Sequence, residues 1–320
     1  MVLAIGWWIV IFVVALVLLV KSSDWFVEYA EKVGLSIGLS PTIIGVLLLA
    51  SGTSLPELAT SIIAMFKNSP EIVFGNVVGS NIFNILVVGG ALFLVAGKGK
   101  FQPTQFKIEM WLVPATAILL LLLSLNLYIS IWESVLLLLA YAGYVAYSVR
   151  QSKVVEDMVE MVTPKATPET ARWYYWLFLL LSIAGICFGS EYTIEAILKI
   201  AEHFTIGKEV ISLTAVAMGT SLPELLVSIA AGRMGKMEMA LGNILGSNIF
   251  NILAIISIPS FLGPMNVPTD MVNISMPLMI LVSFLMVGVI VSKRSSRALG
   301  ALFILTYIVY TAWLYIADAN

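Results

Sequence analysis

The sequence predicts an all-α polytopic membrane protein, with ten transmembrane helices arranged as two inverted five-helix repeats. Three observations predict this fold class: the composition, ten long apolar stretches, and two blocks of sequence that recur at a constant spacing. The 320 residues are 60% hydrophobic and only 11% charged, with a mean hydropathy of +1.01. A soluble globular chain carries about a quarter charged residues, so the composition excludes that class. A net charge of −2 gives no indication of a nucleic-acid partner.

The apolar stretches define the expected spans, because a helix needs about 20 mainly apolar residues to cross the bilayer core. The first stretch carries no charge and lacks the basic start of a secretory signal, so we expect it to be a retained span. Ser40-Pro41 and Ser69-Pro70 each place a cap residue before a proline suited to the first helical turn, which starts the second and third spans. In chain order, the ten expected spans are 3–20, 40–66, 71–97, 108–127, 129–149, 173–190, 207–232, 238–264, 270–292 and 298–317.

The basic residues predict the orientation of these spans. Of the 17 Lys and Arg residues, 14 lie in connections that follow odd-numbered spans, and only Lys67, Lys199 and Lys208 follow even-numbered ones. Cytoplasmic connections carry an excess of Lys and Arg. We therefore expect a multi-pass protein of the cell membrane with both termini extracellular. The longest connection, 151–171, is then a polar cytoplasmic linker.

An internal repeat relates the two halves of the chain. GTSLPELATSIIA at 52–64 recurs as GTSLPELLVSIAA at 219–231, and GNVVGSNIFNIL at 75–86 recurs as GNILGSNIFNIL at 242–253, both offset by 167 residues. The offset divides the chain into a first repeat, 1–150 with block 52–86, and a second repeat, 172–320 with block 219–253. Five spans fit in each repeat, so the second copy enters the membrane from the opposite face, as in many secondary transporters.

Two acidic residues lie in the middle of expected spans: Glu57 in the second and Glu224 in the seventh. A charged side chain is costly there and is by default functional. No Lys, Arg or His lies in the apolar core of any expected span, so each glutamate must be protonated, reach water or meet a cation from outside the chain. Pro56 and Pro223 precede the acids and predict broken helices, because proline lacks an N–H. The backbone carbonyls expected to line a cavity are those of 50–52 and 217–219.

Polar side chains with oxygen atoms surround both breaks. In the third span, Asn76, Ser80 and Asn84 share one helix face at spacings of four residues. One alternative is that these residues only join helices, with both glutamates protonated, but two matched blocks favour a functional site. Oxygen ligands suit hard cations such as Ca²⁺ or Na⁺. The remaining members of the set are Thr53, Ser54, Thr220 and Ser221 at the breaks and Asn243, Ser247 and Asn251 in the eighth span.

The two blocks resemble the repeats of the calcium/cation antiporter superfamily. Gly-Thr-Ser-Leu-Pro-Glu with Gly-Ser-Asn-Ile-Phe-Asn is most similar to its prokaryotic sodium/calcium exchanger branch, and the resemblance covers both halves of the chain. It implies a secondary active antiporter that exchanges Ca²⁺ for Na⁺ by alternating access and exports calcium. Ca²⁺ and Na⁺ are then the transported ions, and no prosthetic group is expected. It also implies that spans 1 and 6 move against the other eight.

The same resemblance implies roles for individual residues. Glu57 and Glu224 are the central calcium ligands, joined by Thr53 and Thr220. Some exchangers carry an acid at one of the two positions held here by Asn84 and Asn251, which leaves sodium stoichiometry, potassium dependence and electrogenicity open. The sodium sites draw on Ser54, Ser80, Ser221, Ser247 and the carbonyls of Ala50 and Ala217, and Asn84 and Asn251 line the middle of the site.

Other functions remain as alternatives. A Ca²⁺/H⁺ antiporter is the nearest, because two close carboxylates in a low dielectric should hold a proton when no cation is bound. A cation channel could use the same oxygens, but its pore usually lies on an axis between subunits, whereas this site is built within one chain that we expect to act as a monomer. An enzyme is the least expected, since neither His-Glu-x-x-His nor Gly-x-Ser-x-Gly occurs.

Overall fold

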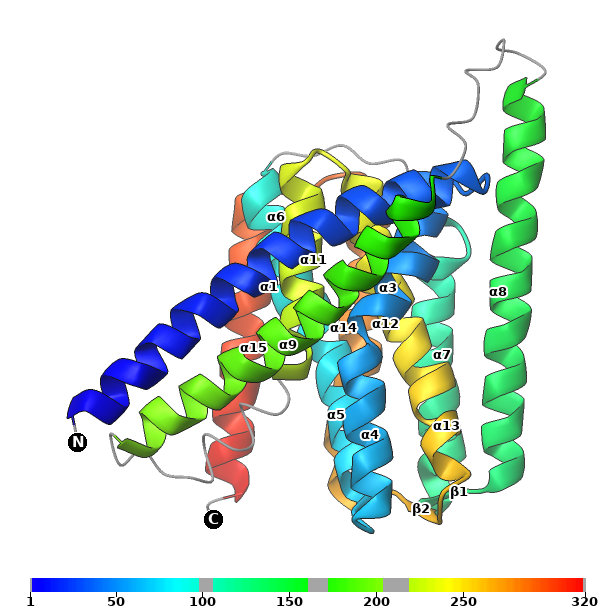
Figure 1. Ribbon diagram of the computed structural model, residues 1–320. Coiled ribbons are helices and arrows are strands. Elements are labelled where there is room, and N and C mark those ends of the chain that lie inside the picture. Colours follow the sequence, from blue (N-terminus) through cyan, green and yellow to red (C-terminus); the bar gives the residue numbers. More distant parts are fainter. Residues whose placement is uncertain (1, 98–105, 161–171, 204–218, 319–320) are drawn as a thin grey trace.

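The computed structural model describes residues 2–97, 106–160, 172–203 and 219–318. Helices dominate these residues and lie side by side in a bundle (Figure 1). Eight of the described helical stretches are long and apolar enough to cross a membrane, and a ninth is added if the bent pair Pro41–Thr53 and Leu55–Phe66 forms one span. The expected seventh span, 207–232, lies partly outside the described residues, so the predicted count of ten is not tested.

The helical segments follow the expected spans in order. Several spans consist of more than one segment, because π-helical turns with a wider hydrogen-bonding pattern interrupt the α-helix. The segments are α1 (Val2–Ser36), α2 (Pro41–Ile43), η1 (Ile44–Leu49), α3 (Ala50–Thr53), α4 (Leu55–Phe66), α5 (Pro70–Phe83), η2 (Asn84–Val88), α6 (Gly89–Ala96), α7 (Glu109–Leu123), η4 (Ser124–Asn126), α8 (Ile131–Glu160), α9 (Trp173–His203), α11 (Leu222–Arg233), α12 (Met237–Phe250), η5 (Asn251–Ile255), α13 (Ser257–Ser260), η6 (Met271–Ser275), α14 (Met276–Ser292) and α15 (Arg297–Asp318).

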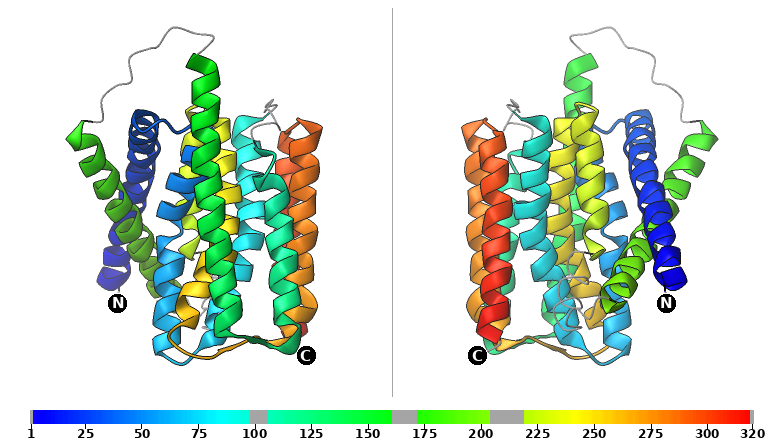
Figure 2. Two further views of the ribbon diagram at one scale, coloured as in Figure 1. Left: turned by 90° about the vertical axis from the view of Figure 1, so that its right-hand side faces the viewer. Right: turned by 90° about the vertical axis from the view of Figure 1, so that its left-hand side faces the viewer.

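Three helices extend beyond the expected boundaries. Helix α1 continues to Ser36 and α9 to His203, well past the apolar stretches that end at residues 20 and 190. At about 1.5 Å per residue, each is longer than the roughly 30 Å bilayer core, and both cross the other helices obliquely on one side of the bundle (Figures 1 and 2). Helix α8 continues to Glu160, so the first half of the expected linker at 151–171 is helical.

A short sheet is an addition to the expected all-α fold. Tyr128–Ile129 (β1) pairs antiparallel with Met265–Asn266 (β2), which ties the connection before α8 to the connection before η6. Both strands lie at one end of the bundle, and both ends of the chain lie toward that same end (Figures 1 and 2).

Helix α12 forms the centre of the bundle, where every residue from Met239 to Phe250 is buried. Glycines allow the broken second span to pack closely against it. A Cβ atom built on Gly242 would lie 2.8 Å from the carbonyl oxygen of Thr42, and one built on Gly246 would overlap the carbonyl oxygen of Val46. A helix buried on every side must satisfy its polar side chains inside the protein, which makes the asparagines and serine of α12 informative.

Candidate cation site

The site begins at two helix breaks. Ser54 leaves helical geometry at φ −86° and ψ 8°, between α3 and α4, and the two halves of the span are bent by 40°. Ser221 has nearly the same geometry, φ −92° and ψ 6°, immediately before α11. Each break is followed by a proline at the start of the next helix, as the sequence predicts, because proline requires no hydrogen-bond partner for an N–H at that position.

Each break places a glutamate in the first turn of the helix that follows it. Glu57 lies in the first turn of α4 and Glu224 in the first turn of α11, and both are fully buried. The N-terminal turn has unpaired N–H groups and a partial positive charge that favours an anion. Neither glutamate forms a salt bridge with a described basic residue. The helix ends therefore supply only partial compensation for two buried carboxyl groups.

Crossed hydrogen bonds join the glutamates to the opposite repeat. The hydroxyl of Ser54 donates to Oε1 of Glu224 at 2.8 Å, and the hydroxyl of Ser221 donates to Oε1 of Glu57 at 3.2 Å. Each glutamate is thus held by the break of the other half of the chain. These contacts bring together the two sequence blocks, which lie 167 residues apart.

Asn76 of α5 supports the first break. Its Nδ2 donates to the backbone carbonyl of Glu57 at 3.0 Å and to the hydroxyl of Ser61 at 3.1 Å. Its Oδ1 accepts a hydrogen bond from the hydroxyl of Thr220 at 3.1 Å. This carboxamide therefore connects the acid of one repeat to the break of the other.

Asn243 of α12 repeats this arrangement for the second break. Its Nδ2 donates to the hydroxyl of Ser228 at 2.9 Å and to the carbonyl of Glu224 at 3.5 Å, and its Oδ1 accepts from the hydroxyl of Thr53 at 3.3 Å. Ser61 and Ser228 were not among the expected site residues. Their identity at the same place in both copies of the repeated block is the sequence signal that could have found them.

Five buried oxygens at the site have no hydrogen-bond partner in the part of the chain that the structure describes. Unpaired buried polar groups are costly, and here they gather on the two breaks and the two facing helices. The set contains carboxylate, hydroxyl and amide oxygens, which is the donor chemistry that Ca²⁺ and Na⁺ require. These atoms are Oε2 of Glu57, Oε2 of Glu224, Oγ of Ser80, Oδ1 of Asn84 and Oδ1 of Asn251.

The backbone carbonyls before the two breaks accept hydrogen bonds. The carbonyl of Ala50 accepts from the N–H of Ser54 at 3.1 Å and from the hydroxyls of Thr53 at 3.3 Å and Ser247 at 3.5 Å. The carbonyl four residues before Pro223, that of Gly219, has lost its helical donor. It accepts a hydrogen bond from the hydroxyl of Ser190 in α9 at 3.0 Å. Ala217 lies outside the described residues.

Helices α1 and α9 carry four acids that are not among the expected ligands. These acids are Asp24 and Glu28 in α1 and Glu191 and Glu195 in α9. Glu28 pairs with Lys32 one turn away at 2.5 Å. Because α1 and α9 are longer than expected, all four acids lie within helices and not at their ends.

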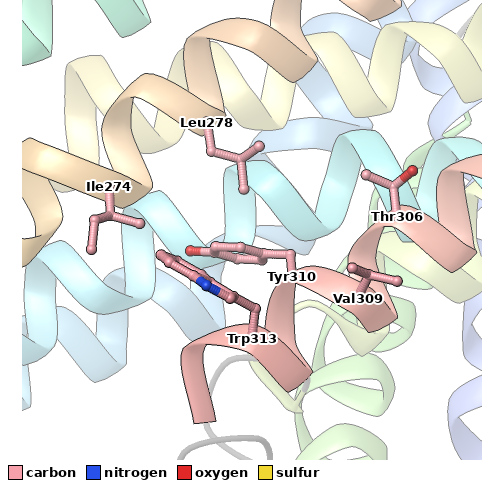
Figure 3. A pocket seen from close by; sticks show the side chains of 6 residues that line it. All are labelled: Ile274, Leu278, Thr306, Val309, Tyr310 and Trp313. Atoms are coloured by element: carbon pink, nitrogen blue, oxygen red, sulfur yellow. The ribbon is translucent and has the colours of Figure 1, made fainter. Parts of the chain in front are cut away.

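An apolar groove on the outer surface is distinct from the site. It lies between the η6–α14 segment and α15 and is lined by Ile274, Leu278, Thr306, Val309, Tyr310 and Trp313 (Figure 3). The hydroxyl of Tyr310 bonds to that of Ser275 at 3.1 Å. The groove contains no charged side chain and lacks the oxygen ligands that a cation needs.

Comparison with known proteins identifies the family. A family model described as sodium/calcium exchanger protein matches residues 7–150 and 174–316, which are the two halves of the chain. The chain belongs to the sodium/calcium exchanger family. Two proteins similar to it are the sodium/calcium exchanger MaX1 of Methanosarcina acetivorans, 31% identical over 95% of this chain and 97% of the relative, and an uncharacterized membrane protein of Methanocaldococcus jannaschii, 31% identical over 95% and 96%.

Solved structures agree with this family membership. The sodium-calcium exchanger NCX_Mj soaked with zero Na⁺ and Ca²⁺ has a TM-score of 0.82 at 29% identity, covering 98% of this chain and 100% of that one. The same exchanger soaked with 2.5 mM Na⁺ and 0.1 mM Ca²⁺ has a TM-score of 0.81, covering 95% and 97%. The exchanger fold therefore extends over nearly the whole length of the chain.

Proposed function

We propose that the protein is a secondary active antiporter that exchanges Ca²⁺ for Na⁺ across the cell membrane by alternating access. Calcium leaves the cell as sodium enters. The observation that carries this proposal is the pair of buried glutamates, each with one unpaired oxygen and neither with a basic partner among the described residues. The similarity to MaX1 and NCX_Mj, which are named as sodium/calcium exchangers, supports the choice of ions.

Charge balance explains why one site can serve both ions. Two carboxylates carry −2, which one Ca²⁺ neutralises and which two Na⁺ also neutralise. Glu57 and Glu224 bind calcium together with the hydroxyls of Thr53 and Thr220. The further ligands, used mainly for sodium, are Ser54, Ser80, Ser221, Ser247, Asn84, Asn251 and the carbonyls of Ala50 and Ala217.

The architecture in this proposal has ten spans in two inverted repeats, 1–150 and 172–320, joined at 151–171. Both termini are extracellular and the protein functions as a monomer. Support comes from the reciprocal bonds of Ser54 and Ser221, in which each repeat completes the acidic site of the other. Inverted repeats typically place the substrate at their interface near the membrane midplane.

In this proposal, movement of the two long oblique helices, α1 and α9, produces alternating access. Helices α1 and α9 pack against each other and contact the broken spans, and each approaches the site differently. In α9, Ser190 bonds to the carbonyl of Gly219, whereas the equivalent Ser23 of α1 bonds to Leu19 of its own helix. Sliding of this helix pair against the remaining bundle would exchange these contacts and open the site first to one side and then to the other.

Coupling to protons is the second candidate function. Two buried carboxyl groups with no basic partner among the described residues hold protons when no metal cation is present. In that case one Ca²⁺ exchanges for protons and the same glutamates carry them. Protons also compete with calcium in the sodium-coupled mechanism, so competition alone does not separate the two.

Flux measurements in proteoliposomes separate these functions. Vesicles loaded with sodium are diluted into radiolabelled calcium in a sodium medium, which leaves no sodium gradient, or in a choline medium, which creates an outward sodium gradient. Sodium-free vesicles with an acidic interior supply a pH gradient as the only driving force. Sodium-coupled exchange predicts calcium uptake against its gradient only with the sodium gradient. Uptake driven by the pH gradient alone would assign the proton antiporter, and calcium flux that needs no counter-ion on the far side would assign a channel.

A further inference from the structure

The repeated motif Gly-Ser-Asn-Ile-Phe-Asn contains a second pair of asparagines, Asn81 and Asn248, three residues before Asn84 and Asn251. Only 1% of the surface of each residue is exposed. Because they occupy equivalent positions of the two repeats, identical surroundings would give them identical hydrogen bonds. Their hydrogen bonds differ: Asn81 bonds to the other repeat and Asn248 to its own helix.

Asn81 links the two repeats in a chain of hydrogen bonds whose direction is fixed. Its Nδ2 donates to the backbone carbonyl of Asn248 at 3.2 Å. A carbonyl only accepts, so the amide nitrogen of Asn81 must face it, and its Oδ1 faces the other way. There Oδ1 accepts a hydrogen bond from Nδ2 of Asn251 at 3.1 Å.

This chain sets the orientation of the Asn251 carboxamide. With its nitrogen committed to Asn81, Asn251 presents Oδ1 as the free atom, and that oxygen is fully buried with no hydrogen-bond partner in the described chain. An amide turned the other way would present N–H groups, which repel a cation. The backbone carbonyl of Asn248 thus fixes the orientation of the Asn81 side chain. Asn81 in turn holds the nitrogen of Asn251, which leaves the Oδ1 of Asn251 free to act as a ligand.

Among the described residues, no equivalent chain of hydrogen bonds runs from Asn248 to Asn84. Nδ2 of Asn248 donates to the carbonyl of Ile244 in its own helix at 2.7 Å. Neither Nδ2 nor Oδ1 of Asn84 has a hydrogen-bond partner among the described residues. The two halves of the site therefore differ, although their sequences in this motif are identical.

We propose that Asn81 is a positioning residue that holds the Asn251 carboxamide with its oxygen toward the bound cation, whereas Asn84 is not held in this way. The proposal rests on the proposed cation site and deepens it, because it makes Asn251 a preorganised ligand. Residues that orient a metal ligand typically change metal affinity by about 10- to 100-fold when they are replaced. Asn248, which has the same type and burial but bonds within its own helix, is the matched control.

Calcium binding to the purified full-length protein tests the proposal. Isothermal titration with Ca²⁺ should give about 10-fold or weaker affinity for Asn81→Ala and a change of less than about threefold for Asn248→Ala, with similar melting temperatures in chelator. Asn81→Leu keeps the side-chain volume and replaces Asn81→Ala if the latter does not fold. Equal losses at positions 81 and 248 would overturn the proposal.

A double-mutant cycle distinguishes positioning from a general structural role. In the Asn251→Asp background, either oxygen of the carboxylate can face the cation, so no orienting partner is needed. Adding Asn81→Ala to this background should weaken calcium binding by less than about threefold, against at least about 10-fold in the parent. An undiminished loss would show that Asn81 acts otherwise and would overturn the proposal.

The outcomes remain distinguishable from those that test the proposed function. A wild-type protein that binds calcium but does not exchange it for sodium would refute the antiporter and leave the positioning role intact. Sodium-driven exchange with equal effects at positions 81 and 248 would refute the positioning role alone. Failure of the wild-type protein to bind calcium would refute both.

Discussion

Replacing Glu57 by glutamine should weaken calcium binding much more than sodium binding. Glu57 is fully buried, its Oε2 has no hydrogen-bond partner among the described residues, and no described basic residue forms a salt bridge with it. Glutamine keeps the size of the side chain and can still accept the bond from Ser221. The substitution therefore removes one negative charge and little else.

The expected magnitude follows from the charges of the two ions. At about 4 Å and an effective dielectric constant of about 20, one carboxylate attracts each unit of cation charge by about 4 kcal/mol. Calcium thus loses about 8 kcal/mol of attraction and each sodium ion about 4 kcal/mol. Removing a buried charge also relieves its desolvation cost, which offsets part of both losses. We expect calcium affinity to fall at least about 100-fold and sodium affinity about 10-fold.

Equilibrium binding measures both effects on one sample. Radiolabelled calcium binding to purified protein gives the calcium affinity, and displacement by sodium gives the sodium affinity. Glu71→Gln is the control, because this acid is exposed in the first turn of α5. Equal losses for the two ions, or a calcium affinity for Glu57→Gln within about threefold of the wild type, would refute the charge argument.

Three further predictions concern packing and protonation. Gly246→Ala should lower the free energy of unfolding by about 1–3 kcal/mol in thermal melts, because its Cβ would overlap a backbone carbonyl of η1, whereas Gly143→Ala, in open space, should not. Ser190→Ala should cost about 1–3 kcal/mol by leaving the Gly219 carbonyl unpaired, and Ser23→Ala, which loses a bond only to its own helix, should cost less. Acidification should weaken calcium binding in titrations, because protons compete with calcium for the carboxyl groups of Glu57 and Glu224 and a protonated glutamate offers the cation no charge; a calcium affinity that does not change with pH would contradict this.

Much of the fold could be predicted from the sequence because membrane spans are determined by local composition. The two helix breaks could also be predicted, since proline removes a donor whatever surrounds it. The lengths of α1 and α9 could not, because hydropathy detects where apolar residues end and not where the helix ends. Acids and lysines continue both helices past their apolar stretches.

The site could be predicted at the level of residue types but not of contacts. Repetition of the blocks selected Glu57 and Glu224 and the hydroxyls beside them. The crossed bonds from Ser54 and Ser221 depend on how the two repeats pack, which no local pattern specifies. The difference between Asn81 and its equivalent in the second repeat was also invisible in the sequence, because identical residues there make different hydrogen bonds.

Simultaneous measurement of sodium and calcium flux tests the central claim most directly. Proteoliposomes containing the wild-type protein are loaded with one radiolabelled ion and diluted into the other, with the pH held equal on both sides. The exchange site described here predicts that the two ions move in opposite directions, that each flux stops when the other ion is omitted, and that Glu57→Gln and Glu224→Gln abolish calcium movement. Fluxes in the same direction, or calcium movement that persists without sodium or without both glutamates, would contradict it.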